Sequence, residues 1–172
     1  MFNVFSNIFQ NGFPGMPSFI GESRENINAA GVVRIDNTTV SEQTIISGIL
    51  NCQNSFLNSL QVTGTTNISH TTINTGVFVG LLVAKNCIFN DNMRVTSNEV
   101  NMKTCSLKDV VVSDQNPSVD QLVLLSGDTV VEGNINFISG RGKVILEDNA
   151  VVNGQVIGGN IERRSNFRFG FF

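Results

Sequence analysis

The sequence has few of the residues on which most enzyme active sites depend. Tyrosine and tryptophan are absent, histidine occurs only at position 70, and the 13 phenylalanines are the only aromatic residues among 172. A single histidine excludes a metal site made of several histidines. It also leaves Cys–His catalysis without a visible third group to orient His70. We therefore expect no enzymatic activity, no metal and no cofactor.

Charged side chains are scarce as well. They make up 15% of the sequence, against about a quarter in typical globular domains. The net charge is −3 and the isoelectric point about 5.0. A nucleic-acid-binding protein needs a basic surface, so we expect no nucleic-acid partner.

Cysteine is sparse, with one residue at each of positions 52, 87 and 105. This odd count does not indicate a disulfide framework and leaves a reducing compartment as the default. The first residues lack the positively charged region of a secretory signal, and no apolar run is long enough to span a bilayer. We expect a cytoplasmic location, with any membrane association confined to the first 20 residues.

What the sequence does contain is a repeat of 16 or 17 residues. Apolar residues recur at fixed offsets within it, and so short a coil has no room for a helix. The pattern predicts an all-β, single-stranded, right-handed parallel β-helix over residues 21–161, with three short strands in each triangular coil. The row heads are Gly31, Gly48, Gly64, Gly80 and Ser97, and the apolar columns are Ile46, Val62 and Phe78; Cys52, Ile68 and Ala84; and Val40, Leu57, Ile73 and Phe89.

Asparagines recur at one offset of this repeat. Asn58, Asn74 and Asn90 share a column, so we expect their amides to stack as a structural ladder of hydrogen bonds along the axis. An aspartate in place of Asn74 should then destabilise the protein more than the same change at an isolated surface asparagine.

Another column combines turn residues with the cysteines beside them. His70 falls in it and is interpreted as a polar turn residue. Cys87 and Cys105 share a position on neighbouring coils, about 5 Å apart at ordinary strand spacing. They are either small buried thiols or a bridged or redox-active pair. The asparagines of the column are Asn37, Asn54 and Asn86.

The regular spacing changes after Asp109. Residues 113–121 contain Pro117, which cannot donate to a strand ladder, and they are predicted to form an excursion loop. Residues 126–135 and 147–156 then match at an offset of 21. We interpret them as a hairpin-like or elongated final pair of coils, which gives roughly seven or eight coils and a length of about 35 Å.

Phenylalanine-rich segments flank the repeat. For residues 1–20, which begin with phenylalanines at helical spacing, three interpretations stay open: a cap over the first coil, an interfacial membrane anchor, or a tail. Residues 162–172 alternate phenylalanine with other residues, as a strand does, and either cap the last coil or dock on a neighbouring molecule. The candidate residues for self-association or capping are Phe2, Phe5, Phe9, Phe13, Phe167, Phe169, Phe171 and Phe172.

Two further places were considered for chemistry. Glu132 and Asp148 could approach each other across the last coils, but the acids are otherwise scattered. A polysaccharide-degrading β-helix needs them clustered on one face. The SGRGK segment at 139–143 lacks the glycine spacing and the following helix of a phosphate loop. Both are interpreted as solvated turns.

The segment LVLLSGDTVVEGNINFISGRGKVILEDNAVVNGQVIGGNIE carries a recurring V-x-G-x-I and a run of the form KVIL-x-x-x-A-x-V-x-G-x-V-x-G. In residues 121–160 the chain resembles the bactofilins, which are small bacterial polymer-forming proteins. The resemblance implies a right-handed β-helix between short tails and end-to-end assembly without nucleotide. It also implies membrane contact through an N-terminal segment that begins Met-Phe, as Met1 and Phe2 do here.

Together these observations predict a non-enzymatic structural or scaffolding protein of cytoskeletal type. Its expected partners are copies of itself, in a homo-oligomer or polymer, with peripheral membrane contact through residues 1–20. The alternative is a monomeric β-helix module that presents a polar Asn/Thr face to carbohydrate or to a partner protein.

Overall fold

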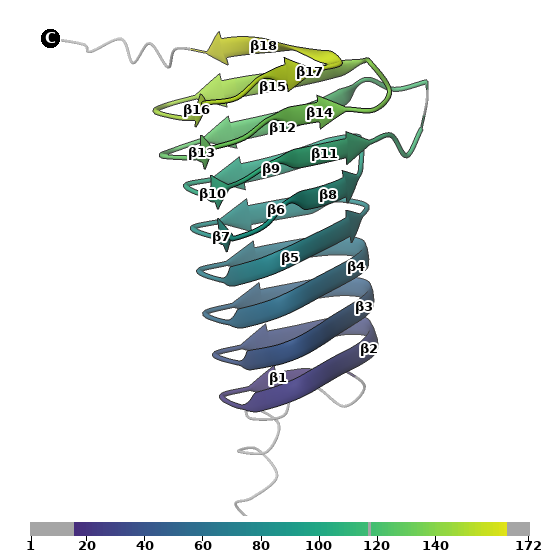
Figure 1. The fold of residues 1–172 in the computed structure, drawn as a ribbon. Helices are drawn as coiled ribbons and strands as arrows, with labels where there is room; N and C mark the ends of the chain where they lie inside the picture. Colours follow the sequence, from purple (N-terminus) through teal and green to yellow (C-terminus); the bar gives the residue numbers. More distant parts are fainter. Residues whose placement is uncertain (1–15, 117, 165–172) are drawn as a thin grey trace, which may run out of the picture.

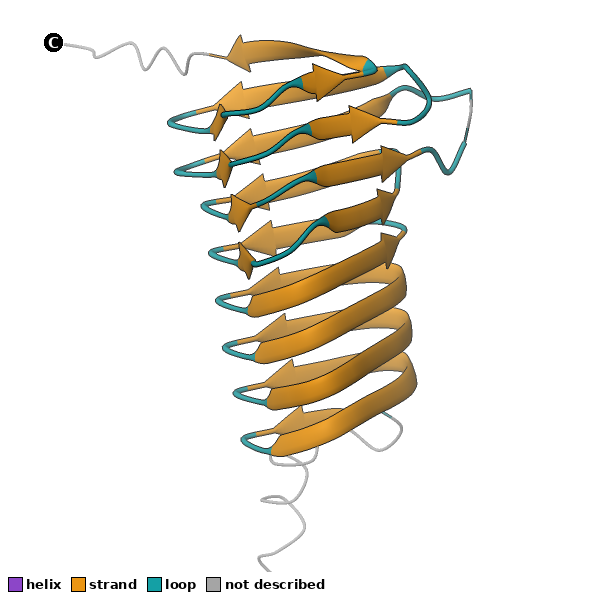
Figure 2. Ribbon diagram, viewed as in Figure 1, coloured by secondary structure: helices purple, strands orange, loops and turns teal. Residues whose placement is uncertain are grey.

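The computed structural model describes residues 16–116 and 118–164, which form one parallel β-solenoid (Figures 1 and 2). Over this part of the chain Figure 2 shows strands and loops and no helix. The described residues contribute eighteen strands to a single sheet that winds through about nine coils. The predicted all-β parallel β-helix is thereby confirmed.

The solenoid is longer than the seven or eight coils predicted, because strands continue past both expected limits. β1 (Ser18–Ile20) pairs with β2 (Ser23–Asp36) inside the segment assigned to a cap or anchor. At the other end β18 (Gly159–Arg164) passes the expected boundary at residue 161 and pairs with β15 (Gly142–Glu147). About nine coils at the usual spacing of ~4.8 Å give a length of roughly 43 Å.

In the first coils one long strand replaces the three short strands that were predicted. β2 bends round most of its coil, as do β3 (Thr39–Gln53) and β4 (Phe56–Ser69). The bends fall at Gly48 and Gly64, which pair with each other in register, so the ladder of hydrogen bonds passes through the corner without a break.

From β7 onward each coil consists of three strands, as predicted. A strand of two residues lies on a narrow side, and two further strands form the opposing faces (Figure 1). The remaining strands are β5 (Thr72–Val79), β6 (Leu82–Lys85), β7 (Ile88–Phe89), β8 (Met93–Thr96), β9 (Glu99–Lys103), β10 (Ser106–Leu107), β11 (Val110–Ser113), β12 (Gln121–Ser126), β13 (Val130–Val131), β14 (Ile135–Phe137), β16 (Val151–Val152) and β17 (Val156–Ile157).

The last coils are elongated, and the hairpin-like interpretation of them is wrong. Val130 pairs with Val151 and Ile135 with Val156, both in parallel, whereas a hairpin requires antiparallel strands. The longer spacing is taken up in part by the loop between β11 and β12, which leaves the coil between Ser113 and Gln121 (Figure 1). Pro117, on which the loop was predicted, lies outside the described residues.

The predicted apolar columns are present in register and form the core. Leu57 pairs with Ile73, which pairs with Phe89. These side chains are at most 1% exposed and belong to one continuous cluster that fills the solenoid. Phe78 contacts Phe89 edge to face, with ring centroids 6.3 Å apart. Alternation along each strand therefore sends one residue inward and the next outward on every coil.

The corner glycines are required both by their backbone angle and by the coil beneath. Gly48 and Gly64 each have a φ of +133°, which residues with a side chain rarely adopt. A Cβ on Gly64 would lie 1.9 Å from the carbonyl oxygen of Gly48. Gly31, at the start of the column, has a φ of +93° and nothing within 4 Å of the same position.

We expect Gly64→Ala to destabilise the solenoid by several kcal/mol, roughly 3 or more, because it combines an unfavourable φ with a clash against main chain that cannot move aside. Gly31→Ala is the matched control and should cost about 1 kcal/mol, since only the φ is unfavourable there. Urea unfolding of both variants measures the difference. Equal losses would show that the coil beneath does not constrain the corner.

Candidate functional site

The three asparagines of the ladder lie one above another on successive coils. Asn74 Nδ2 donates to Asn58 Oδ1 at 2.8 Å, and Asn90 Nδ2 donates to Asn74 Oδ1 at 2.8 Å. Lys108 and Glu132, which follow the next two residues of the adjoining apolar column, form an exposed ion pair. The amides thus fix the alignment of neighbouring coils, which is a structural role and not a catalytic one.

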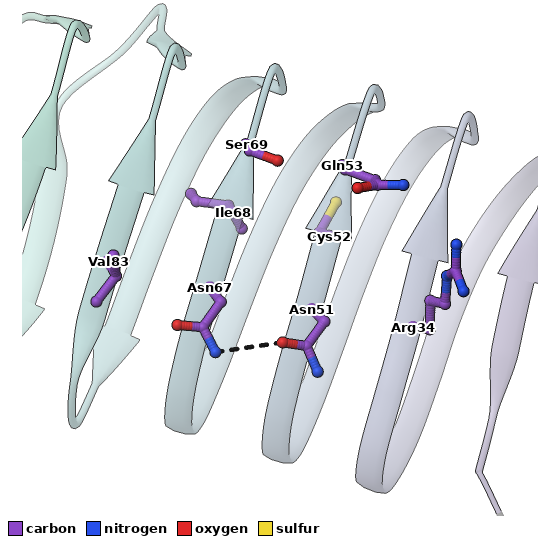
Figure 3. A pocket seen from close by; sticks show the side chains of 8 residues that line it. All are labelled: Arg34, Asn51, Cys52, Gln53, Asn67, Ile68, Ser69 and Val83. Atoms are coloured by element: carbon purple, nitrogen blue, oxygen red, sulfur yellow. Dashed lines mark hydrogen bonds between the residues drawn. The ribbon is translucent and has the colours of Figure 1, made fainter.

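A shallow pocket of about 390 Å³ lies on the outer face of the first coils (Figure 3). Asn67 Nδ2 donates to Asn51 Oδ1 at 3.2 Å across its floor. Arg34 and Gln53 both donate to the carboxylate of Asp36, at 3.0 and 2.8 Å. The full lining is Arg34, Asn51, Cys52, Gln53, Asn67, Ile68, Ser69 and Val83.

Partial burial alone would raise the pKa of the Asp36 carboxyl. The hydrogen bonds from Gln53, Arg34 and Asn54 outweigh it and leave the pKa below its ordinary value. Asp36 is therefore ionised at neutral pH and holds these polar groups in place. What the pocket offers a ligand is a set of amide donors and acceptors on a rigid surface.

A column of turn residues runs the length of the solenoid beside the short strands. His70 lies in it, and Asn86 Nδ2 lies 2.9 Å from His70 Nε2. Each non-glycine member has a positive φ between 49° and 55°, a conformation that asparagine and aspartate tolerate better than most residues. These members are Asn37, Asn54, His70, Asn86, Thr104 and Asp148.

A buried residue follows each of these turns, and sequence analysis recognised only its two cysteines. Ser55 Oγ donates to the carbonyl of Gln53 at 2.7 Å, and Thr71 Oγ1 to that of Ser69 at 2.8 Å. In two coils a thiol donates in the same way. The signal was visible as a Ser, Thr or Cys immediately after a turn residue. The column consists of Thr38, Ser55, Thr71, Cys87, Cys105, Thr129 and Ala150.

The thiols are poor nucleophiles. Burial raises the pKa of Cys52 to about 11, despite hydrogen bonds with Thr71 and Ser55. Its hydrogen bond with Cys87, together with burial, raises the pKa of Cys105 well above its ordinary value. The three cysteines are reduced and buried, and a protonated, inaccessible thiol does not attack a substrate.

The two acids singled out in the sequence do not form a pair. Glu132 is ion-paired with Lys108, whereas Asp148 accepts a hydrogen bond from the main-chain N–H of Gly127 at 3.0 Å. In the SGRGK segment, Lys143 lies on β15 and is ion-paired with Glu162. Within residues 16–116 and 118–164, no group of three or more His, Cys, Asp or Glu side chains is arranged to hold a metal ion.

The C-terminal end of the solenoid is open. β18 is exposed along its whole length, and Ile157 and Ile161 are 46% and 51% exposed. Ile161 pairs with Val144, which is fully buried one coil earlier, so it continues an inward-facing column. The phenylalanines proposed for self-association or capping, at positions 2, 5, 9, 13, 167, 169, 171 and 172, lie outside the described residues.

Arg163 closes one corner of this open end. One coil earlier, the N–H groups of Asn149 and Val151 donate to the carbonyls of Gly127 and Thr129, at 3.1 and 2.9 Å. The corresponding acceptors on the last coil are the carbonyls of residues 148 and 150. The Arg163 guanidinium donates to both, at 3.4 and 2.9 Å. Its side chain thus supplies the two donors that a further coil would have provided.

No family model, curated protein or solved structure matches this chain. In the part of the chain that the structure describes, no helix has the length and apolar character needed to cross a bilayer.

We expect Asn74→Asp to lower the free energy of unfolding by about 1 kcal/mol, because a carboxylate cannot donate the hydrogen bond that Asn58 accepts. Asn28→Asp, at an exposed position on β2, should have little effect. Thermal melting of the two variants measures the difference. The same shift in both would mean that the stacked amides contribute no more than an ordinary surface residue.

Replacing Arg163 with alanine leaves two carbonyls of the last coil without their donors, and we expect a loss of about 1 kcal/mol. Arg164→Ala is the control, because its guanidinium contacts Glu162 and Glu147 at 3.4 and 3.8 Å on the exposed side. Exposed ion pairs of this kind contribute roughly 0–1 kcal/mol, usually at the low end. Urea unfolding should rank Arg163→Ala as the more destabilised variant, and the opposite order would contradict the capping role.

Proposed function

We propose that the protein is a non-enzymatic scaffold, a rigid β-solenoid that associates with copies of itself through the open end of its last coil. The observation that carries this proposal is the state of β18. It pairs with β15 along one edge, and within the described residues no strand pairs with its other edge. Ile157 and Ile161 are exposed beside that edge. An unpaired strand with apolar neighbours is a template for another chain.

Rigidity suits the solenoid to a scaffolding role. The amides of Asn58, Asn74 and Asn90 bond along the axis in addition to the main-chain ladder. A tube held together in this way keeps a fixed length between whatever it contacts at its two ends. Arg163 covers only the turn corner, so the edge of β18 is left available for a second copy.

The likeness of residues 121–160 to the bactofilins supports the same proposal, because those proteins assemble end to end. Under it, the protein forms a homo-oligomer or polymer in the cytoplasm. The phenylalanine-rich segments then add contacts beyond the coils, either between copies or, for residues 1–20, with a membrane surface.

A monomeric binding module is the second candidate, and the pocket on the first coils favours it. Arg34, Asn51, Gln53 and Asn67 present amide and guanidinium groups from three adjacent coils (Figure 3). Such groups hydrogen-bond to the hydroxyls of a carbohydrate or to the main chain of a partner protein. The pocket contains no aromatic ring on which a sugar could stack.

Sedimentation velocity over a graded concentration series tests the scaffold proposal. The full chain should form larger species as its concentration rises, with filaments or discrete oligomers visible by negative-stain microscopy. Ile161→Asp places a charge at the open end and should shift the assembly to at least tenfold higher concentration. Ile49→Asp is the matched control, because Ile49 is 40% exposed on β3, far from that end.

A chain that stays monomeric at every concentration would eliminate the scaffold proposal and leave the binding module. Assembly that both variants weaken equally would also count against it, because the contact would then not lie at the last coil.

A further inference from the structure

Two of the three cysteines lie directly above one another inside the solenoid. The N–H of Ser106 donates to the carbonyl of Cys87 at 2.9 Å, and Ser106 pairs with Ile88. Cys87 and Cys105 therefore occupy equivalent positions on adjacent coils. Both are at most 2% exposed, and both donate to the carbonyl two residues earlier, at 3.3 and 3.4 Å. Their side chains hydrogen-bond to each other.

Main-chain groups of the coil beneath contact each sulfur. Cys87 is hydrogen-bonded to the main chain of Thr71, and Cys105 to the main chain of Cys87. The same contact occurs with hydroxyls elsewhere in the column, where the Thr38 N–H donates to Ser55 Oγ at 3.1 Å. Donors aimed at sulfur stabilise negative charge on it. The column therefore surrounds the two sulfurs with groups suited to a pair of thiolates.

We propose that Cys87 and Cys105 form a buried, two-coordinate site for one soft monovalent cation of the copper(I) class. Soft thiolate ligands select soft ions. A bond from metal to thiolate sulfur is about 2.3 Å for zinc, so an ion of similar size held linearly between two sulfurs separates them by ~4.6 Å. Adjacent strands are spaced by about 4.8 Å. Side chains in equivalent positions on adjacent coils match this separation without a change in the fold.

The surroundings favour two-coordinate binding over a four-coordinate ion such as zinc. Zinc takes four ligands in structural sites, and the described residues offer no group of three or more His, Cys, Asp or Glu side chains placed for a metal. The neighbours of the pair in its column, Thr71 and Thr129, carry hydroxyls, which are hard ligands. Cys52 contacts Thr71 Oγ1 at 3.7 Å, one coil away from Cys87.

Binding replaces two S–H bonds with two sulfur–metal bonds. Both protons leave to solvent, the ion keeps its oxidation state, and no electron is transferred. The site then carries one net negative charge, which the main-chain hydrogen bonds to the sulfurs partly offset. Such a site would hold two coils together in the middle of the solenoid.

The test uses the full chain, reduced and kept free of oxygen, with copper(I) supplied as its bathocuproine disulfonate complex. The protein should withdraw one ion per chain from the chelator, with the stoichiometry read by native mass spectrometry. Cys87→Ser and Cys105→Ser should each lower the affinity at least tenfold, and Cys52→Ser should leave it unchanged. Serine is suitable because Ser55 already fills this column, so the variants should fold.

Thermal melting gives a second readout, because an ion that binds only the folded chain raises its melting temperature. The rise should occur in the natural protein and in Cys52→Ser, and be lost in the other two variants. Copper(I) affinity no higher than that of the Cys87→Ser, Cys105→Ser double variant would overturn the proposal. An equal loss of affinity in Cys52→Ser would also do so, as would binding of one zinc ion per chain that the same two variants abolish.

Discussion

The structure depends on main-chain hydrogen bonds between one coil and the next, made in a fixed register along the whole axis. Gly48 pairs with Gly64, Leu57 with Ile73 and Val130 with Val151, each in parallel. Because these bonds place every residue above its counterpart, each position must suit the residues directly above and below it. The apolar columns, the asparagine ladder and the glycine corner are three solutions to that one requirement.

The same requirement explains why chemically different residues take equivalent places. Ser55, Thr71 and Cys87 each bond to the carbonyl two residues earlier, so hydroxyl and thiol are interchangeable as turn donors. At the end of the stack the requirement can no longer be met by another coil. There the guanidinium of Arg163 takes over the bonds to two main-chain carbonyls.

Much of the fold could be predicted, because a repeat of 16 or 17 residues fixes which side chains coincide. The column of Leu57, Ile73 and Phe89 follows from the spacing alone. The lengths of individual strands did not follow, since a glycine corner can either end a strand or, as at Gly48, let it continue. The direction of the final coils was also ambiguous, because matching segments at an offset of 21 fit either parallel or antiparallel pairing.

Features at the ends and beside the turns were harder to find. Arg163 reads as part of a basic tail until the position of the last coil is known, and its two acceptors are main-chain atoms that no side-chain pattern reveals. The buried column after the turns was within reach of sequence analysis. It was missed because its members, such as Thr38 and Cys105, were examined by residue type and not by position.

The direction of the hydrogen bonds has a mechanical consequence. β1 and β18 lie at opposite ends of the tube (Figure 1), and the bonds between coils run along the line that joins them. Tension between the two ends therefore loads the outermost coil first and peels it away before the next one is strained. Stretched in this way, the molecule would lengthen in a series of small yielding steps, whereas a force across the tube would meet many bonds at once.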